Sequence, residues 1–151
     1  MTAAFSIRAA NASDLPAINT LMHASRAYRG EYYKIIENYF VTPDYLAKNK
    51  VFLVERNGAL LGFYSLVVDG IADLDLMFVS DDVQGSGVGR ALFDHMKTTA
   101  RQSGYDAVQI GAHPPAVGFY ERMGAVRCGV SPPIHGVTWE RPLLKLAIAE
   151  T

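Results

Sequence analysis

The clearest pattern in the chain is an apolar run that passes through a polar turn into a helix. Residues 74–79 are apolar except for Asp75 and predict a buried strand, whereas residues 80–86 are mostly polar and predict a turn. Apolar residues then recur at helical spacing until Gly104, which predicts the end of a helix. The members of this stripe are Val88, Ala91, Leu92, Phe93, Met96 and Ala100.

Short apolar runs on both sides of this unit predict a sheet. The turn signals Asn57-Gly58 and Asp69-Gly70 separate three runs that we expect to form consecutive antiparallel strands. The predicted strands are Phe5–Ala9, Val51–Glu55, Leu60–Val68, Ile71–Val79, Ala107–Gly111, Ala125–Cys128 and Val137–Leu146. The predicted fold class is α/β with α+β character: a mixed, mostly antiparallel twisted sheet with helices on both faces.

Further helical patterns lie between these strands. We expect a helix capped by Ser13, a short helix from a Thr42 cap to about Asn49, and another over Pro115–Met123. Residues 28–40, YRGEYYKIIENYF, predict an amphipathic helix because their apolar positions repeat at helical spacing. The side chains that this helix would bury are Tyr32, Ile35, Ile36, Tyr39 and Phe40.

Length, charge and cysteine content narrow the class of protein. At 151 residues the chain predicts one domain, residues 1–151, and 14 Lys and Arg against 15 Asp and Glu leave a net charge of −1. That balance disfavours nucleic acid and anionic membranes as partners. Cys128 is the only cysteine, and the histidines show no metal-ligand spacing, so we expect no metal site. The absence of a signal-like segment favours a cytoplasmic protein.

The polar turn carries three alternate glycines, Gly85, Gly87 and Gly89, directly before the helix. Such glycines let the backbone approach a ligand, and the helix N-terminus presents unpaired N–H groups to an anion. Arg90 occupies the position of the last glycine in a dinucleotide fingerprint, and no P-loop lysine follows the turn. The turn therefore predicts a cradle for a pyrophosphate outside those two nucleotide-binding classes.

Two motifs together resemble the GNAT superfamily, the acyl-CoA-dependent N-acyltransferases. The first is Gln84-x-x-Gly87-x-Gly89 and the second is Phe119-Tyr120-Glu121-Arg122-Met123-Gly124-Ala125, and with the strand between them they span residues 73–128. The resemblance implies a GNAT fold, acetyl-CoA as the cofactor, and two central strands that splay where the cofactor enters. The cofactor-binding residues it implies are Phe78, Val79, Gln84, Gly85, Ser86, Gly87, Val88, Gly89, Arg90 and Phe119.

The resemblance also implies Tyr120 as the proton donor to the leaving thiolate, with packing under the cofactor as the alternative. Asp73 and Asp75 lie two residues apart on one predicted strand, so we expect them on one face, where burial and mutual repulsion would raise one pKa toward that of a working base. A solvated or salt-bridged pair is the other interpretation. Glu31 and His113 remain alternative bases. Pro115 stands where relatives carry an asparagine that contacts the cofactor, which puts that contact in doubt.

The acceptor side rests on the resemblance alone. In the family the segment between the first two helices forms a wall of the acceptor pocket, which implies Tyr28, Glu31, Tyr32 and Tyr33 as residues that bind the amine. The region of Trp139 and Arg141 is expected to close this side, and a homodimer is plausible there. We expect Cys128 to be a small buried residue and not a nucleophile. The predicted function is direct transfer of the acetyl group of acetyl-CoA to a primary amine of a small molecule or peptide, without a covalent Cys128 intermediate. The alternative is a non-catalytic acyl-CoA-binding module.

Overall fold

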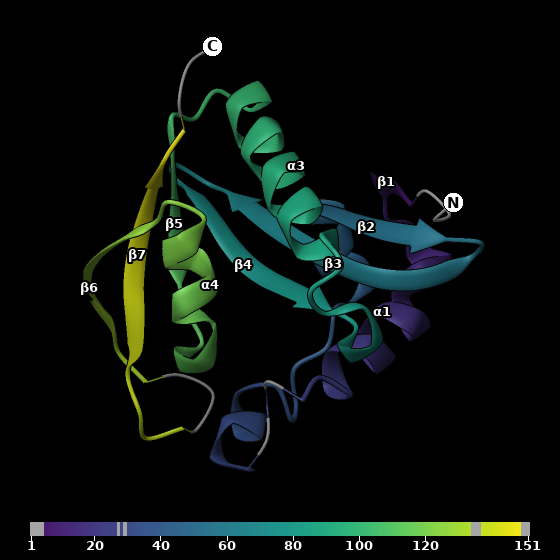
Figure 1. The fold of residues 1–151 in the computed structure, drawn as a ribbon, viewed down its shortest axis with the longest axis horizontal. Helices are drawn as coiled ribbons and strands as arrows, with labels where there is room; N and C mark the ends of the chain where they lie inside the picture. Colours follow the sequence, from purple (N-terminus) through teal and green to yellow (C-terminus); the bar gives the residue numbers. More distant parts are fainter. Residues whose placement is uncertain (1–4, 27, 29, 134–136, 149–151) are drawn as a thin grey trace.

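A seven-stranded mixed sheet forms the centre of the molecule (Figure 1). The computed structural model describes residues 5–26, 28, 30–133 and 137–148. Across the sheet the order is β1 (Ser6–Ala9), β2 (Lys50–Arg56), β3 (Ala59–Val68), β4 (Ala72–Val79), β5 (Ala107–Gly111), β7 (Arg141–Ala147) and β6 (Val126–Ser131). Neighbouring strands pair antiparallel, except that β4 and β5 are parallel. The predicted mixed, mostly antiparallel sheet is therefore confirmed.

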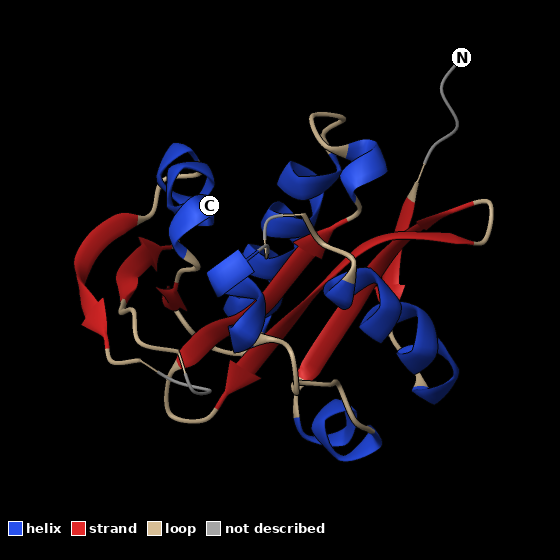
Figure 2. Ribbon diagram, turned by 90° about the horizontal axis from the view of Figure 1, so that it is seen from below, coloured by secondary structure: helices blue, strands red, loops and turns tan. Residues whose placement is uncertain are grey.

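Helices cover both faces of this sheet (Figure 2). In chain order they are η1 (Ala12–Asp14), α1 (Leu15–His23), η2 (Gly30–Ile35), α2 (Pro43–Lys48), η3 (Asp81–Val83), α3 (Val88–Gln102), η4 (Pro114–Ala116) and α4 (Val117–Arg122). One buried core lies between the sheet and α3 and α4, with Phe93 and Met96 fully buried in it. A second core packs α1 and η2 on the opposite face around Ile18 and Phe63. We call these the α3-side core and the α1-side core.

The tight turn between β2 and β3 forms as predicted. Asn57 and Gly58 both adopt left-handed backbone angles, with φ of 53° and 80°, as a two-residue type I′ hairpin requires. The turn fixes the pairing of Arg56 with Ala59, and the ladder continues to Lys50 and Leu66 with one irregularity.

The first helical unit is capped by Asn11 and not by Ser13 as predicted. The Asn11 side chain accepts a hydrogen bond from the Ser13 backbone N–H at 3.0 Å, and the Asp14 carboxylate accepts one from the Asn11 N–H at 2.8 Å. Arg8 of β1 also donates two hydrogen bonds of 2.9 Å to Asp14. The reciprocal capping box begins two residues before the predicted cap, and the contact with β1 fixes it there.

The aromatic segment 28–40 is not one amphipathic helix. Only η2 forms within it, and the chain then turns instead of continuing as a helix. Ile35 and Ile36 are buried as predicted, but Phe40 is 51% exposed. Gly30 has a left-handed φ of 57°, and aromatic residues are weak helix formers, so tertiary contacts determine this segment.

Two predicted elements near the C-terminus differ from the structure in extent. The helix predicted over Pro115–Met123 is divided between η4 and α4. The strand predicted from Val137 begins only at Arg141. Val137 is buried in the α1-side core, so its apolar character reflects packing rather than strand pairing.

Gly62 lets β3 and β4 pack closely beneath α3. A Cβ added there would lie 2.7 Å from the Phe78 carbonyl oxygen and 3.3 Å from Val79 Cα. We expect Gly62→Ala to lower the free energy of unfolding by about 1–3 kcal/mol, because backbone atoms of a paired strand must shift. Urea denaturation measures this loss. Gly129→Ala is the control, since its added Cβ meets only a Leu143 methyl at 3.9 Å; equal losses for the two variants would contradict the close-packing explanation.

Candidate active site

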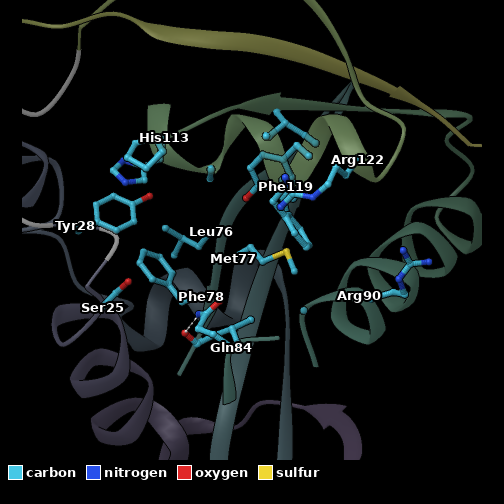
Figure 3. Close-up of a pocket in the computed structure, with 18 of the residues that line it drawn as sticks. Ser25, Tyr28, Leu76, Met77, Phe78, Gln84, Arg90, His113, Phe119 and Arg122 are labelled. Carbon is cyan, nitrogen blue, oxygen red and sulfur yellow. Dashed lines mark hydrogen bonds between the residues drawn. The ribbon is translucent and has the colours of Figure 1, made fainter. Parts of the chain in front are cut away.

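The parallel strands β4 and β5 separate at a cavity of about 660 Å³ (Figure 3). Their paired register consists of Asp73 opposite Gln109, and the cavity is lined by β4 from Leu74 to Val79. The remaining walls come from the turn before α3, the end of β5 and α4. Two central strands thus part at a cavity, which is the arrangement implied by the resemblance.

The glycine-rich turn forms one end of the cavity. Gly85 and Gly87 have left-handed φ values of 78° and 91°, and Gly87 is the N-terminal cap of α3. These angles explain the glycines, because side chains rarely adopt such backbone conformations. Of the residues predicted to bind the cofactor, those that line the cavity are Phe78, Val79, Gln84, Gly85, Gly87, Gly89, Arg90 and Phe119.

Ser86 and Val88, also predicted to bind the cofactor, do not line the cavity with their side chains. The Val88 side chain is buried in the α3-side core, and the Ser86 hydroxyl donates to the Val83 carbonyl oxygen. The Gln84 side-chain amide donates to the Val79 carbonyl oxygen at 3.0 Å and so connects the turn to the end of β4 (Figure 3). The turn can therefore contact a ligand through its backbone, while two of its side chains stabilise the turn itself.

Tyr120 lies in α4 and lines the cavity. It is only 8% exposed and packs against Phe93 and Phe119, at ring-centroid distances of 6.1 and 5.5 Å. Burial raises the pKa of its phenol well above the ordinary value. Tyr120 is therefore a neutral hydrogen-bond donor at physiological pH.

A β-bulge places Asp75 at the cavity. Leu76 pairs with Ser65 and Leu74 with Leu66, so Asp75 is the extra residue on β4. Its carboxylate accepts hydrogen bonds from the hydroxyls of Tyr39 at 3.1 Å and Tyr45 at 2.5 Å. The Tyr45 hydroxyl is also within hydrogen-bond distance of Ser65. Asp75 is exposed at the cavity wall, and the two phenols fix its orientation.

Asp73 lies two residues before Asp75 on β4 and does not line the cavity. Burial, together with the nearby Asp75 carboxylate, raises its pKa from 3.8 to about 6, against an opposing effect of Arg141. The predicted electrostatic coupling of two aspartates is thus present, and it acts on Asp73. A salt-bridged pair does not form, since no described basic group lies within 4.0 Å of either carboxylate.

Tyr28 and His113 form the other end of the cavity, opposite Arg90 and Arg122 (Figure 3). The two rings stack at 3.7 Å with an interplanar angle of 13°, and Tyr28 also packs on Phe78 at 5.1 Å. Burial is the main cause that raises the pKa of Tyr28; Tyr120 and Asp75 also raise it, and Arg141 lowers it. The Tyr28 phenol therefore lies within electrostatic reach of all three groups.

Two other residues predicted to bind the amine, Tyr32 and Tyr33, do not line the cavity. Tyr32 packs edge-on against His113 at 5.0 Å and Trp139 at 5.2 Å, behind the cavity wall. Tyr33 instead contacts His23 at 6.2 Å in the α1-side core. The side chain of Glu31 lies outside the part of the chain that the structure describes. Of the three predicted residues whose side chains the structure describes, Tyr28 lines the cavity and Tyr32 and Tyr33 do not.

Several residues at the cavity were not predicted from any motif or pattern in the sequence. Tyr39 and Tyr45 reach Asp75 from segments about 30 residues away, and the bulge that brings them together cannot be read from the strand pattern. Ser25 and Arg122 line the cavity without belonging to a predicted contact. Arg122 does lie inside the second motif, and its position one helical turn from Gly118 could have indicated it.

Cys128 is exposed on β6, so the prediction that it is a small buried residue is wrong. It also does not line the cavity. Among the described residues no group of His, Cys, Asp and Glu could hold a metal ion, while His135 lies outside the description. Within the same residues no helix has the length and apolar character needed to cross a membrane.

A family model described as an acetyltransferase (GNAT) domain matches residues 24–139. The chain belongs to the GNAT acetyltransferase family. The match includes the glycine-rich turn and the cavity residues Tyr120, Tyr28 and His113. GNAT enzymes use acetyl-CoA as the acetyl donor. The search of the curated proteins found no match.

Solved GNAT structures share the fold. The ribosomal-protein-S18-alanine N-acetyltransferase from Escherichia coli has a TM-score of 0.72 at 21% identity, covering 98% of this chain and 96% of that one. The yncA protein from Salmonella typhimurium, solved with its cofactor acetyl-CoA, has a TM-score of 0.71 at 20% identity, with coverages of 98% and 96%. An N-acetyltransferase from Staphylococcus aureus gives 0.73 at 16% identity, with coverages of 97% and 99%. These similarities confirm the predicted GNAT fold.

The raised pKa of Asp73 predicts a pH-dependent cost in stability. Between pH 4 and 6 the Asp73 carboxyl is ionised in the unfolded chain, whereas in the folded protein it stays mostly protonated up to about pH 6. Stability is therefore lost as the pH rises through this window. We expect Asp73→Asn to raise Tm by about 2–4 °C at pH 7.5, with the electrostatic gain reduced by solvent screening, and to have little effect at pH 4.

Thermal unfolding at several pH values measures this difference. Asp106→Asn is the matched control, because Asp106 is exposed and should leave the pH dependence of Tm unchanged. An equal effect of Asp73→Asn at both pH values would contradict the electrostatic explanation.

Proposed function

We propose that the protein is an acetyl-CoA-dependent N-acetyltransferase that transfers the acetyl group directly to a primary amine of a small molecule or peptide in a ternary complex. The observation that carries the proposal is one continuous cavity, lined by the glycine cradle, by Tyr120 and by Asp75. An anion-binding turn and a carboxylate in the same cavity support binding of an acyl-CoA and an amine together.

The residues of the cavity fit acetyl-CoA. Gly85 and Gly87 turn the backbone into the left-handed region directly before the 15-residue helix α3, whose N-terminus favours a pyrophosphate. No heavy atom lies within 4 Å of a Cβ added at Gly87, so this face of the turn is open to a ligand. Along β4, backbone groups on the side of β5 can pair with the amides of the pantetheine arm, much as a strand would.

When bound, acetyl-CoA supplies the acetyl thioester: the acceptor nitrogen forms the C–N bond, the C–S bond breaks, and the N-acetyl product and CoA thiol leave. Tyr120 donates its phenolic proton to the sulfur, a role that its raised pKa permits without prior ionisation. An acceptor that arrives as an ammonium ion loses two protons. One passes through the base to solvent, and the other restores Tyr120.

Asp73 and Asp75 have separate roles in this proposal, proton acceptance and binding of the amine. With a pKa of about 6, Asp73 is mostly ionised at neutral pH yet basic enough to accept a proton, and it acts through water because it does not line the cavity. Asp75 lines the cavity and is held by Tyr39 and Tyr45, so we assign it to binding the ammonium group.

The function is tested by release of free thiol from acetyl-CoA in the presence of amines, amino acids, polyamines and peptides. We expect Tyr120→Phe to lower kcat by about 100-fold, the lower end of a general acid's contribution, with little change in CoA affinity. Tyr33→Phe is the control, because Tyr33 lies outside the cavity. Unchanged turnover would return Tyr120 to a packing role. Tight CoA binding without amine-dependent thiol across the panel would instead favour a non-catalytic acyl-CoA-binding module.

The cradle is tested separately by CoA binding, measured by calorimetry. Gly87→Ala places a side chain at a φ of 91°, which costs about 1–2 kcal/mol and should distort the turn, so we expect about 10-fold weaker CoA binding. Gly58→Ala imposes a similar strain at a φ of 80° in the remote hairpin. That variant should lose stability but keep its CoA affinity. Normal affinity in Gly87→Ala would remove the cradle assignment.

A further inference from the structure

Arg141 carries a buried N–H donor without an acceptor, next to the end of the cavity that Tyr28 and His113 form. It begins β7, and its guanidinium lies over Gly111, which lines the cavity. A Cβ added at Gly111 would lie 3.0 Å from Arg141 Nη1 and 3.3 Å from Cζ. The guanidinium therefore covers the end of β5 at the point where the strand borders the cavity.

The hydrogen-bonding capacity of Arg141 is almost unused within the described part of the chain. Nη1 donates to the Gly111 carbonyl oxygen at 3.5 Å, the outer limit of a hydrogen bond. The Nε atom is buried without an acceptor, and no described carboxylate lies within 4.0 Å of the guanidinium. A guanidinium has five N–H donors, and leaving buried donors unpaired is costly. The position therefore fits an anion supplied by a ligand.

Trp139 strengthens this interpretation. Its indole Nε1 is also buried without an acceptor among the described residues, only two positions before Arg141. The Trp139 ring packs against Tyr32 and lies 6.4 Å from the His113 ring, which belongs to the cavity wall. Two buried N–H donors without acceptors thus lie next to residues that line this end of the cavity, Arg141 beside Gly111 and Trp139 near His113, although neither Arg141 nor Trp139 lines the cavity itself.

The groups near Arg141 indicate which part of a ligand would carry the anion that its guanidinium binds. The charge of Arg141 acts on Tyr28 and Asp73, lowering the pKa of each against the dominant effect of burial. Tyr28 lines the end of the cavity that we assign to the acceptor, and Asp73 lies two residues before Asp75 without lining the cavity, whereas Arg90 and Arg122 border the opposite end (Figure 3). Carboxylates for an ammonium group and a guanidinium for an anion therefore lie together at the acceptor end.

We propose that the acceptor is an amino acid, whose carboxylate binds Arg141 and whose amino group is held by Asp75 next to Asp73. This inference rests on the proposed N-acetyltransferase function and specifies its substrate class. An arginine and a carboxylate are the side chains that best match the two ends of a zwitterion, because the planar guanidinium binds a carboxylate through paired hydrogen bonds. A peptide N-terminus or a simple polyamine carries no carboxylate beside its amine and would leave Arg141 unsatisfied.

The experiment compares free amino acids with their carboxamides, which keep the amine but lack the carboxylate. The probes are the α-amino acids, β-alanine and γ-aminobutyrate, each assayed with its carboxamide by thiol release from acetyl-CoA. We expect kcat/KM of at least one free amino acid to exceed that of its carboxamide by at least about 10-fold, the effect of one charge-assisted hydrogen bond. Equal or faster turnover of the carboxamides would overturn the proposal.

The Arg141 assignment is tested on the same pairs. Arg141→Gln should raise KM for the free amino acid by about 10- to 100-fold with kcat within about threefold, and leave the carboxamide unaffected. Arg141→Lys should restore part of the loss, because it restores the charge without the fork geometry. Arg127→Gln on the neighbouring strand is the control, since Arg127 is exposed. An equal effect of Arg141→Gln on acid and amide would overturn the carboxylate contact.

Failure of the inference can be distinguished from failure of the proposed function. Trp139 is the only tryptophan, so its fluorescence reports amino-acid binding to the CoA-saturated protein without any turnover. If simple amines are acetylated and amino acids neither bind nor react, the substrate class is wrong and the function stands. If no amine is acetylated, the function fails, and the inference fails with it unless free amino acids still bind more tightly than carboxamides. Should Arg141→Gln not fold, the comparison in the wild-type protein decides.

Discussion

The separation of β4 from β5 is the constraint on which the rest of the site depends. On one side β4 pairs with β3 from Ala72 to Val79, whereas on the other its register with β5 is limited to Asp73 and Gln109. Backbone groups that lose a strand partner in an interior cost about 1–3 kcal/mol each unless another donor or acceptor replaces it. A ligand with amides along its length meets this need, so the feature that opens the cavity also selects for a cofactor arm like that of CoA.

Backbone conformation shapes one end of the cavity, whereas side-chain contacts shape the other. At the glycine-rich turn, backbone conformation is decisive: left-handed Gly85 and Gly87 lead into α3, and the Ser86 hydroxyl donates to the Val83 carbonyl oxygen. At the acceptor end side chains are decisive, because the bulge at Asp75 is held by phenols from two separate segments. Under the proposed function, changes of side chain can therefore alter the choice of acceptor while the cofactor site keeps its shape.

Sequence reasoning succeeded where the signal was local. Asn57-Gly58 determines its own hairpin, and the alternate glycines determine the left-handed turn before the amphipathic helix α3, so both turns could be placed from a few adjacent residues. It failed where a distant contact decides the outcome. Arg8 fixes the Asn11 capping box through Asp14, and packing, not periodicity, shapes residues 28–40. The acceptor end depends on such distant contacts almost entirely, which is why its residues were the least predictable.

Tyr28 stands at the His113 end of the cavity, and the neutrality of its phenol has a physical consequence. Its phenol lies within electrostatic reach of Tyr120, Arg141 and Asp75, and burial holds its pKa above the ordinary range. An ionised phenolate there would repel Asp75 and compete with a ligand for Arg141. A neutral phenol can instead donate a hydrogen bond to whichever group of the acceptor lies nearest. Tyr28 is held in place by stacking on His113 and packing on Phe78, so under the proposed function it can set the position of the amine relative to Tyr120.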